Sequence, residues 1–427
     1  MNPATPVRWR AIGALTAVSA LAQIGQFGIG FMVLPVWLAH HGLDAPRAGL
    51  FSAAQWAGMV AGLLAAPHLA ERIGAKATVT LGLAASIVAF ATIGWLAWPW
   101  WLIPGMLTGL GIGLRWIANE TWLYRLVPER ASGRVVGIHE ALIAAAGVIG
   151  PALATWCAVD GRITFGAGAL FTFAAAIPLW LTAAESRRPN AARSSGRPAN
   201  PLAAPTTPQT RELALQPHLP AHVATEPAKA RSQTTAIGPL VCLGMVVVAF
   251  GGLGDGALYG LFPLFADGRG LSATQTATLL TCFGIGGMAL QFPVGWFAQR
   301  VSLAAAVVVC AAASALAVVS FALAAPASGL LAASAVLLGG MNSAFITLGM
   351  FAAASGDKAA LTRNMRLVSL TFTVSSIAGP LLAGFAMKAL GSDMLMWQLA
   401  LASGALAIYT LGLLEGRRQP REASSAS

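Results

Sequence analysis

Five ionisable residues stand inside long apolar runs of the sequence: Arg115, Glu120, His139, Glu140 and Asp255. An ionised side chain at the centre of a lipid-spanning helix costs at least ~2.5 kcal/mol on insertion scales, so residues of this kind usually bind an ion, a proton or a charged group. Three of them are acids and only one is an arginine, so two acids lack a basic partner. Because apolar surroundings favour the neutral form of a carboxyl group, the chemistry that these residues predict is reversible protonation inside a membrane.

The depth of these residues differs along their apolar runs. Arg115 lies ten residues before Arg125, which is about 15 Å along a helix, and Asp255 lies twelve residues before Asp267, about 18 Å. Both positions fall near the middle of a ~30 Å hydrocarbon core. Glu120 lies only five residues from Arg125, so a position at the membrane interface is the alternative for it.

Helical periodicity groups several polar residues on common faces. Four residues of one run share an arc of about 140°: Arg115, Trp116, Asn119 and Glu120. Asp255 and Tyr259 are one turn apart and share a face. Glu140 and His139 follow Arg134 closely, so a position outside the span is the alternative for that pair. The residues of these faces that we expect to line a central cavity are Trp116, Asn119 and Tyr259. Hydrogen bonding between helices is the alternative for the amides, as it is for Gln55 and Gln291.

The composition excludes most other protein classes. Of the 427 residues, 57% are hydrophobic and 10% are charged, whereas a soluble chain carries roughly 25% charged residues. A soluble enzyme, a secreted disulfide scaffold and a disordered protein are therefore excluded. The net charge of +11 would suit a nucleic-acid binder, but the basic residues separate the apolar runs and do not cluster, so we expect no nucleic-acid partner. The four cysteines lack metal-ligand spacing, and we expect no metal site.

The apolar runs predict a multi-pass helical membrane protein, because lipid offers backbone groups no outside partner. The expected spans are 11–39, 49–70, 77–97, 99–123, 134–158, 162–183, 237–265, 273–298, 301–323, 329–353, 364–388 and 394–415. With the N-terminus inside, most Lys and Arg residues between spans fall on the cytoplasmic side, as the positive-inside rule requires. We therefore expect both termini in the cytoplasm and the chain in the cell inner (plasma) membrane.

The two halves of the chain repeat each other. A shift of 228 residues places Gly58 on Gly286, and a shift of 229 places Gly150-Pro151 on Gly379-Pro380. Two parallel repeats with a binding site between them are typical of transporters. The polar, proline-rich stretch between the halves predicts a disordered linker. The expected domains are six-helix bundles at 1–183 and 236–416, a disordered cytoplasmic linker at 184–235 and a cytoplasmic tail at 417–427.

The loop after the second span carries a glycine, then an acid, an arginine, a glycine and a base, and it resembles the cytoplasmic signature of the major facilitator superfamily. The residues are Gly62, Glu71, Arg72, Gly74 and Lys76, with a partial second copy at Gly295, Gln299 and Arg300 and a further basic position at Arg134. The second copy has a glutamine where the family usually has an acid. A carboxylate such as Glu71 can bind arginines or face a helix N-terminus in one conformation and release them in the other, so we expect these residues to form a gate, or latch. A solvated turn is the alternative, and Gln299 should make the second latch weaker because it is uncharged. Gly147, Gly150 and Pro151 resemble the glycine-proline signature of efflux members, repeated at Gly379 and Pro380.

Within the superfamily, the chain is most similar to the YcaD-type branch. The supporting stretches are Gly109–Gly111, Gly133-Arg134, Leu258–Leu264 and Pro293–Gly295. The family often has an arginine early in the fourth span, where this chain has Gly105. A proton-coupling scheme cannot be transferred from that family arginine to this chain.

The resemblance implies an all-α fold of twelve transmembrane helices in two parallel six-helix repeats. It also implies a secondary transporter that works by alternating access, with spans 1, 4, 7 and 10 around a central cavity. The resemblance thereby adds Gln23 and Gln26 of span 1 and Asn342 of span 10 to the residues expected to line that cavity, with hydrogen bonding between helices as the alternative for these amides. We expect a proton-coupled exporter of a small organic or amphipathic solute, monomeric and without a cofactor. An importer or uniporter of a small metabolite is the alternative, and a channel or receptor-like protein is the alternative outside transporters. No nucleophile–base pair or histidine-rich site suggests an enzyme.

Overall fold

The computed structural model describes residues 8–127, 132–156, 161–182, 237–325, 328–355 and 361–425, and every regular element in these ranges is a helix. The predicted linker at 184–235 and Cys157 lie outside the described residues. The backbone of Arg134 and Glu140 is described, but their side chains are not.

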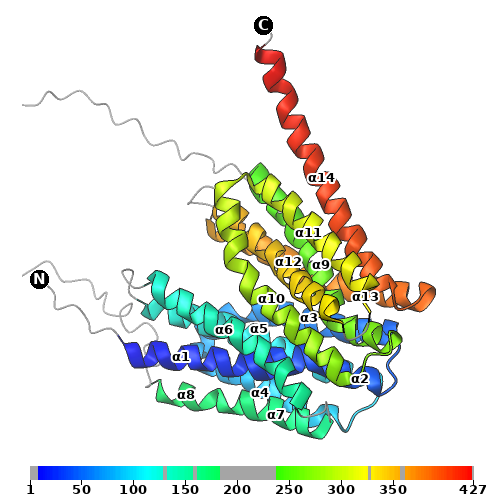
Figure 1. The fold of residues 1–427 in the computed structure, drawn as a ribbon. Coiled ribbons are helices and arrows are strands. Elements are labelled where there is room, and N and C mark those ends of the chain that lie inside the picture. Colours follow the sequence, from blue (N-terminus) through cyan, green and yellow to red (C-terminus); the bar gives the residue numbers. More distant parts are fainter. Residues whose placement is uncertain are drawn as a thin grey trace, which may run out of the picture. The chain divides into compact units, whose positions relative to one another are not determined.

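The first half of the chain begins with one long helical run made of α1 (Trp9–Ala22), the π-helical segment η1 (Gln23–Val33) and α2 (Leu34–His40). The helices α3 (Ala45–Ile73), α4 (Ala75–Ile93), α5 (Leu102–Leu126), α6 (Ser132–Trp156), α7 (Gly161–Ala174) and α8 (Ala176–Leu181) follow. The second half holds α9 (Pro239–Gly268), α10 (Ala273–Arg300), α11 (Leu303–Leu323), α12 (Gly329–Ala354), α13 (Leu361–Leu390) and α14 (Met394–Ser425) (Figure 1). Each predicted span coincides with one of these helices or with a run of joined helices.

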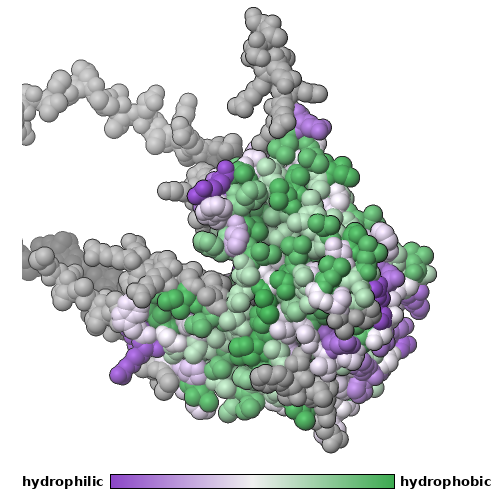
Figure 2. Space-filling view, in the orientation of Figure 1, coloured by the Kyte–Doolittle hydropathy of each residue, from purple (hydrophilic) through white to green (hydrophobic). Residues whose placement is uncertain are grey.

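Ten helices of the described residues are long and apolar enough to cross a membrane. The helices α5 and α6 have the length for a span but fall outside this group. They carry four of the five ionisable residues from which the sequence predicts chemistry: Arg115 and Glu120 in α5, and His139 and Glu140 in α6. The coloured surface in Figure 2 is largely apolar over the middle of the helices, with hydrophilic residues towards their ends, as expected for helices that face lipid.

The predicted repeat is visible in the way that equivalent helices pack. A Cβ atom added to Gly58 of α3 would collide with the backbone oxygen of Met106 in α5, and one added to Gly286 of α10 would collide with that of Val336 in α12. Only glycine permits so close an approach of two backbones. Because Gly58 and Gly286 are related by the predicted shift of 228 residues, the second and fourth spans of both halves pack in the same manner.

The two halves share one hydrophobic cluster at one end of the helices. This end holds the loops 41–44, 269–272 and 391–393, and we call it the closed end. The cluster includes Leu43 and Phe51 from the first half and Phe262 and Ala383 from the second. Towards the opposite end, the other large clusters each belong to a single half. The two halves therefore pack together at the closed end and keep separate cores at the other.

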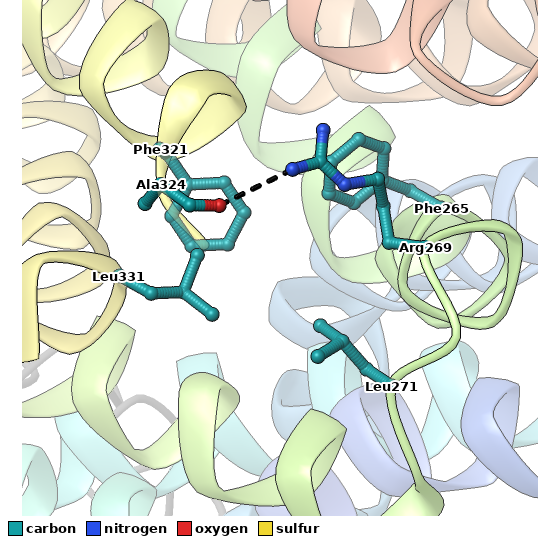
Figure 3. Close-up of a pocket in the computed structure, with 6 residues that line it drawn as sticks. All are labelled: Phe265, Arg269, Leu271, Phe321, Ala324 and Leu331. Carbon is teal, nitrogen blue, oxygen red and sulfur yellow. Dashed lines mark hydrogen bonds between the residues drawn. The ribbon is translucent and has the colours of Figure 1, made fainter. Parts of the chain in front are cut away.

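An arginine secures the closed end within the second half. Arg269, just after α9, donates a hydrogen bond from its guanidinium to the backbone oxygen of Ala324 at 3.3 Å (Figure 3). It donates a second one to the backbone oxygen of Ala322 at 2.9 Å. It lies over the ring of Phe265, 5.9 Å from the centroid. A helix leaves its last carbonyl groups without internal partners, and these bonds satisfy two at the end of α11. The void between these residues measures only about 10 Å³, so it holds no solute.

Candidate functional site

A cavity of about 200 Å³ lies between the two halves. Its walls come from η1 and α6 in the first half and from α9, α10 and α12 in the second. Two of the predicted cavity residues, Gln23 and Tyr259, line it. Phe27, Phe283 and Ser343 also line it. They could not be predicted from the sequence, because aromatic and small polar residues are common on lipid-facing and packing surfaces as well.

Arg115 lies inside the first half and not on the cavity wall. Its side chain is buried, and its Nε donates a hydrogen bond to Oε1 of Gln26 at 3.0 Å. The amide of Gln26 in turn donates to Ser86 Oγ at 2.7 Å and to the backbone oxygen of Gly82 at 3.2 Å. These bonds join α5, η1 and α4 through polar side chains in an apolar interior. Arg115, which was predicted on a cavity-facing side of α5, thus has its hydrogen-bond partner within its own half.

Glu120 and His139 form a buried pair in the first half. Nε2 of His139 lies 2.8 Å from Oε1 of Glu120, and Nδ1 of His139 lies 3.2 Å from Thr16 Oγ1. Ser19 Oγ donates to Oε1 of Glu120 at 3.4 Å and accepts from the amide of Asn119 at 2.8 Å. The second carboxylate oxygen of Glu120 is buried without a hydrogen-bond partner. The network joins α1, α5 and α6.

Asp255 belongs to a separate pair in the second half. The amide of Asn342 on α12 donates to Oδ1 of Asp255 on α9 at 2.5 Å. Tyr259, one turn after Asp255, lines the cavity. Each of Arg115 and Asp255 therefore has a neutral amide as its hydrogen-bond partner, and among the described residues no ion pair joins the two.

The predicted cavity residues thus divide into two groups. Gln23 and Tyr259 line the cavity, whereas Gln26, Asn119 and Asn342 make hydrogen bonds within a half. Trp116 is 43% exposed and is not among the residues that line the cavity. In the part of the chain that the structure describes, no group of three or more His, Cys, Asp or Glu residues is placed to hold a metal ion.

The family model of the Major Facilitator Superfamily matches this chain over residues 15–272 and 244–427. The chain belongs to the Major Facilitator Superfamily. Among curated proteins it is similar to the uncharacterized MFS-type transporter YcaD of Escherichia coli O17:K52:H18, with 22% identity over 96% of this chain and 95% of the relative. It is also similar to YcaD of Escherichia fergusonii, with 20% identity over 69% of this chain and 67% of the relative. The predicted family and branch are confirmed.

Solved structures of the superfamily have the same fold. A point mutant of the nucleoside transporter NupG has a TM-score of 0.73 at 12% identity, and the match covers 94% of this chain and 99% of that one. A D-xylose-proton symporter has a TM-score of 0.66 at 11% identity, covering 95% and 97%. A bacterial homolog of the lysosomal transporter Spinster, in an inward-facing conformation, has a TM-score of 0.66 at 13% identity, covering 96% of both. These likenesses confirm the predicted all-α MFS fold, and the chain is a multi-pass membrane transporter of the kind that moves solutes.

The superfamily signature lies at the end opposite the closed end. Gly74 has a φ of +89°, which favours glycine, and it forms the turn between α3 and α4. Lys76 Nζ lies 3.5 Å from the backbone oxygen of Thr182, just after α8. Glu71 and Arg72 are exposed, and within the described ranges Glu71 makes no hydrogen bond or ion pair. Gly62 approaches Gly113 of α5, where an added Cβ would lie 2.9 Å from its Cα.

The second copy of the signature lies at the same end of the other half. The guanidinium of Arg300 lies over the ring of Trp296, 4.1 Å from its centroid. Gln299 is exposed, and Gly295 has open space around it, with only Thr347 within 4 Å of an added Cβ. The gating role of both copies stays a prediction.

The glycine-proline signature packs α6 against the first span. A Cβ added to Gly150 would collide with Gly28 of η1, and Gly147 lies near the amide of Gln23. In the second half, a Cβ on Gly379 of α13 would collide with the backbone of Leu253 in α9. The repeated residues Gly150-Pro151 and Gly379-Pro380 therefore each lie where a fifth or eleventh span meets the first span of its half.

Proposed function

We propose that this protein is a proton-coupled secondary transporter that moves a small organic or amphipathic solute by alternating access. The observation that carries the proposal is the cavity between the halves. Tyr259 lines this cavity, and Asp255 lies one helical turn before Tyr259 on α9. A solute in this cavity contacts helices of both halves, so its binding is sensitive to their relative arrangement. That sensitivity is what couples binding to a change between two conformations.

The arrangement of the cores supports alternating access. The halves pack together at the closed end and hold separate cores at the other. With both termini in the cytoplasm of a cell whose inner membrane holds the protein, the closed end faces outward and the conformation is inward-facing. The distribution of Lys and Arg between spans supports that orientation.

Asp255 is the residue that we propose carries the proton. It is an acid within a span, its hydrogen-bond partner Asn342 is neutral, and it lies on the same face of α9 as cavity-lining Tyr259. Proton binding there changes the charge beside the cavity without breaking an ion pair. Glu120 is the second candidate, because His139 lies 2.8 Å from it and offers a proton partner inside the first half.

Export is the direction that we propose, because Gly147, Gly150 and Pro151 resemble the signature of efflux members. The chain packs that signature against η1, which contributes Gln23 to the cavity wall. Import of a small metabolite, or uniport, is the alternative, and the protein is proposed to act as a monomer without a cofactor.

Transport in proteoliposomes tests this proposal. A solute found by thermal-shift screening of a metabolite panel is offered with and without a pH gradient, and its exchange is measured with equal concentrations on both sides. We expect Asp255→Asn to abolish accumulation driven by the pH gradient and to retain exchange, because exchange needs no net proton movement. Glu120→Gln is the matched control.

The roles are reversed if Asp255→Asn still accumulates the solute against its gradient while Glu120→Gln does not. In that case the proton is carried in the first half. If neither variant responds differently from the wild type to the pH gradient, the proposal of proton coupling is wrong and uniport remains.

A further inference from the structure

We propose that the cavity between the halves binds an uncharged, flat molecule of about one ring that carries a hydrogen-bond donor and acceptor side by side, as a ring carboxamide or lactam does. This inference rests on the proposed function, because it takes the cavity as the substrate site. It adds the chemical class of the substrate.

The charge of the cavity wall is the first property that restricts the substrate. Among the residues whose side chains the structure describes, none that lines the cavity is charged. Two charged residues within the described spans do not line the cavity and have other partners: Arg115 is hydrogen-bonded to Gln26 and Asp255 to Asn342. A charged solute would lose its hydration without gaining an opposite charge, which is costly in an apolar site. The lining therefore selects uncharged molecules.

Two glutamines line the cavity, one from each half. Gln23 lies on the wall from the first half and Gln291 on the wall from the second. Two other glutamines of the spans have protein partners: Gln26 binds Ser86, and Gln55 donates to the backbone oxygen of Gly30 at 2.8 Å. In the described ranges, the side chains of Gln23 and Gln291 make no such hydrogen bond.

An amide side chain offers one acceptor and one donor at neighbouring positions. Such a group pairs with a second amide, or with any ring edge that presents a donor beside an acceptor, through two hydrogen bonds at once. The hydroxyl of Ser343 adds a further donor or acceptor on the wall of the second half. Two free amides on opposite walls thus match a neutral molecule with an amide-like edge.

The aromatic lining and the volume of the cavity restrict the shape and size of the substrate. Three aromatic residues line the cavity, Phe27, Tyr259 and Phe283, and the rings of Phe27 and Tyr259 meet edge to face with centroids 6.1 Å apart. Aromatic walls favour flat rings. An apolar cavity of about 150 Å³ takes up benzene, so a cavity of about 200 Å³ has room for one ring with a short substituent.

Three pyridine probes of nearly equal size test the inference: nicotinamide, which is neutral; nicotinate, which is an anion; and 3-(aminomethyl)pyridine, which is largely a cation at neutral pH. Binding to the purified full-length protein is measured by thermal shift and calorimetry, without any gradient. We expect saturable binding of nicotinamide at concentrations up to about 10 mM and at least about tenfold weaker binding of both charged probes.

Variants of the two glutamines give the second readout. Gln23→Leu and Gln291→Leu are expected to weaken nicotinamide binding about tenfold each, since each removes a pair of hydrogen bonds. Gln291→Glu is expected to reverse the preference and favour the cationic probe, because it places a carboxylate on the wall. Gln398→Leu is the matched control, since Gln398 donates to the backbone oxygen of Gly379 outside the cavity and should leave nicotinamide affinity unchanged.

The inference is overturned if either charged probe binds as tightly as nicotinamide, if nicotinamide does not bind, or if the leucine variants bind it like the wild type. Failure of the proposed function gives a different result. Nicotinamide would then bind with the expected dependence on Gln23 and Gln291, but proteoliposomes would neither exchange it nor accumulate it.

Discussion

Replacing Gly49 by leucine is expected to open the closed end. Gly49 lies near the start of α3, and a Cβ added there would collide with the backbone oxygen of Pro380 in α13 and lie 3.6 Å from the Cα of Gly384. Both contacts join the first half to the second. A leucine side chain has no room at this position while the closed end is packed, but the clash disappears once the halves separate there.

The size of the effect follows from the clash. Inserting a bulky side chain into a well-packed interface costs about 1–3 kcal/mol. The higher helix propensity of leucine relative to glycine acts in both conformations and cancels in their ratio. The population of the packed closed end should therefore fall by roughly 5- to 150-fold relative to the separated one. Gly404→Leu on α14 is the matched control, because an added Cβ at Gly404 has nothing within 4 Å.

Distances between pairs of spin labels in lipid measure this change. One pair spans the closed end, at the exposed positions His40 and Leu390, and the other spans the opposite end, at Ile73 and Gln299. In Gly49→Leu we expect the first distance to lengthen and the second to shorten. If both distance distributions match those of the wild type while the melting temperature falls, the clash is absorbed without separating the halves, and the reasoning about the closed end is wrong.

Three further predictions concern the rest of the chain. Glu71→Gln should weaken the predicted latch at the end opposite the closed end and raise the accessibility of cysteines in the cavity from that end, whereas Gln299→Glu should change it little; equal accessibility in Glu71→Gln and the wild type would contradict the latch. His139→Ala should destabilise the fold by about 3–5 kcal/mol, because it leaves the carboxylate of Glu120 buried without that partner; adding Glu120→Gln should recover much of the loss in melting temperature, and no recovery would contradict the pairing. Protease outside right-side-out vesicles should not cleave residues 184–235, and cleavage there would overturn the orientation.

The fold could be predicted from the sequence because lipid restricts the choices. A run of about 20 apolar residues without backbone partners outside itself must become a helix. The repeat could be recognised in the sequence because close helix packing requires glycine at fixed positions, as at Gly58 and Gly286. Helix ends were less predictable: α14 continues to Ser425, past the expected end of the span at residue 415, since a helix can extend beyond an apolar segment into water. The division of the chain into the four predicted domains stays a prediction.

The site was less predictable, because periodicity tells which residues share a face but not what the face meets. Asp255 and Tyr259 are one turn apart on α9, and of the two Tyr259 lines the cavity while Asp255 is hydrogen-bonded to Asn342. Gln23 and Gln26 were both expected at the cavity, yet Gln23 lines it while Gln26 binds Arg115. Both lie in the π-helical segment η1, whose i→i+5 hydrogen bonds change the angular spacing of side chains from that of an α-helix. No pattern in the sequence predicts this change from α-helical to π-helical spacing.

The positions of the charged residues indicate how binding of a neutral substrate and binding of a proton affect one another. Arg115, Glu120 and Asp255 each keep their hydrogen-bond partners within one half, so these bonds can survive when the halves separate at either end. In the part of the chain whose side chains are described, no charged residue lines the cavity, so no ion pair between these residues has to break when the halves move. Under the proposed function, the proton on Asp255 and the solute meet only through α9, where Tyr259 is part of the cavity wall one turn away. Coupling would then depend on the packing of α9 against α12 and α13 more than on direct contact between the proton site and the substrate.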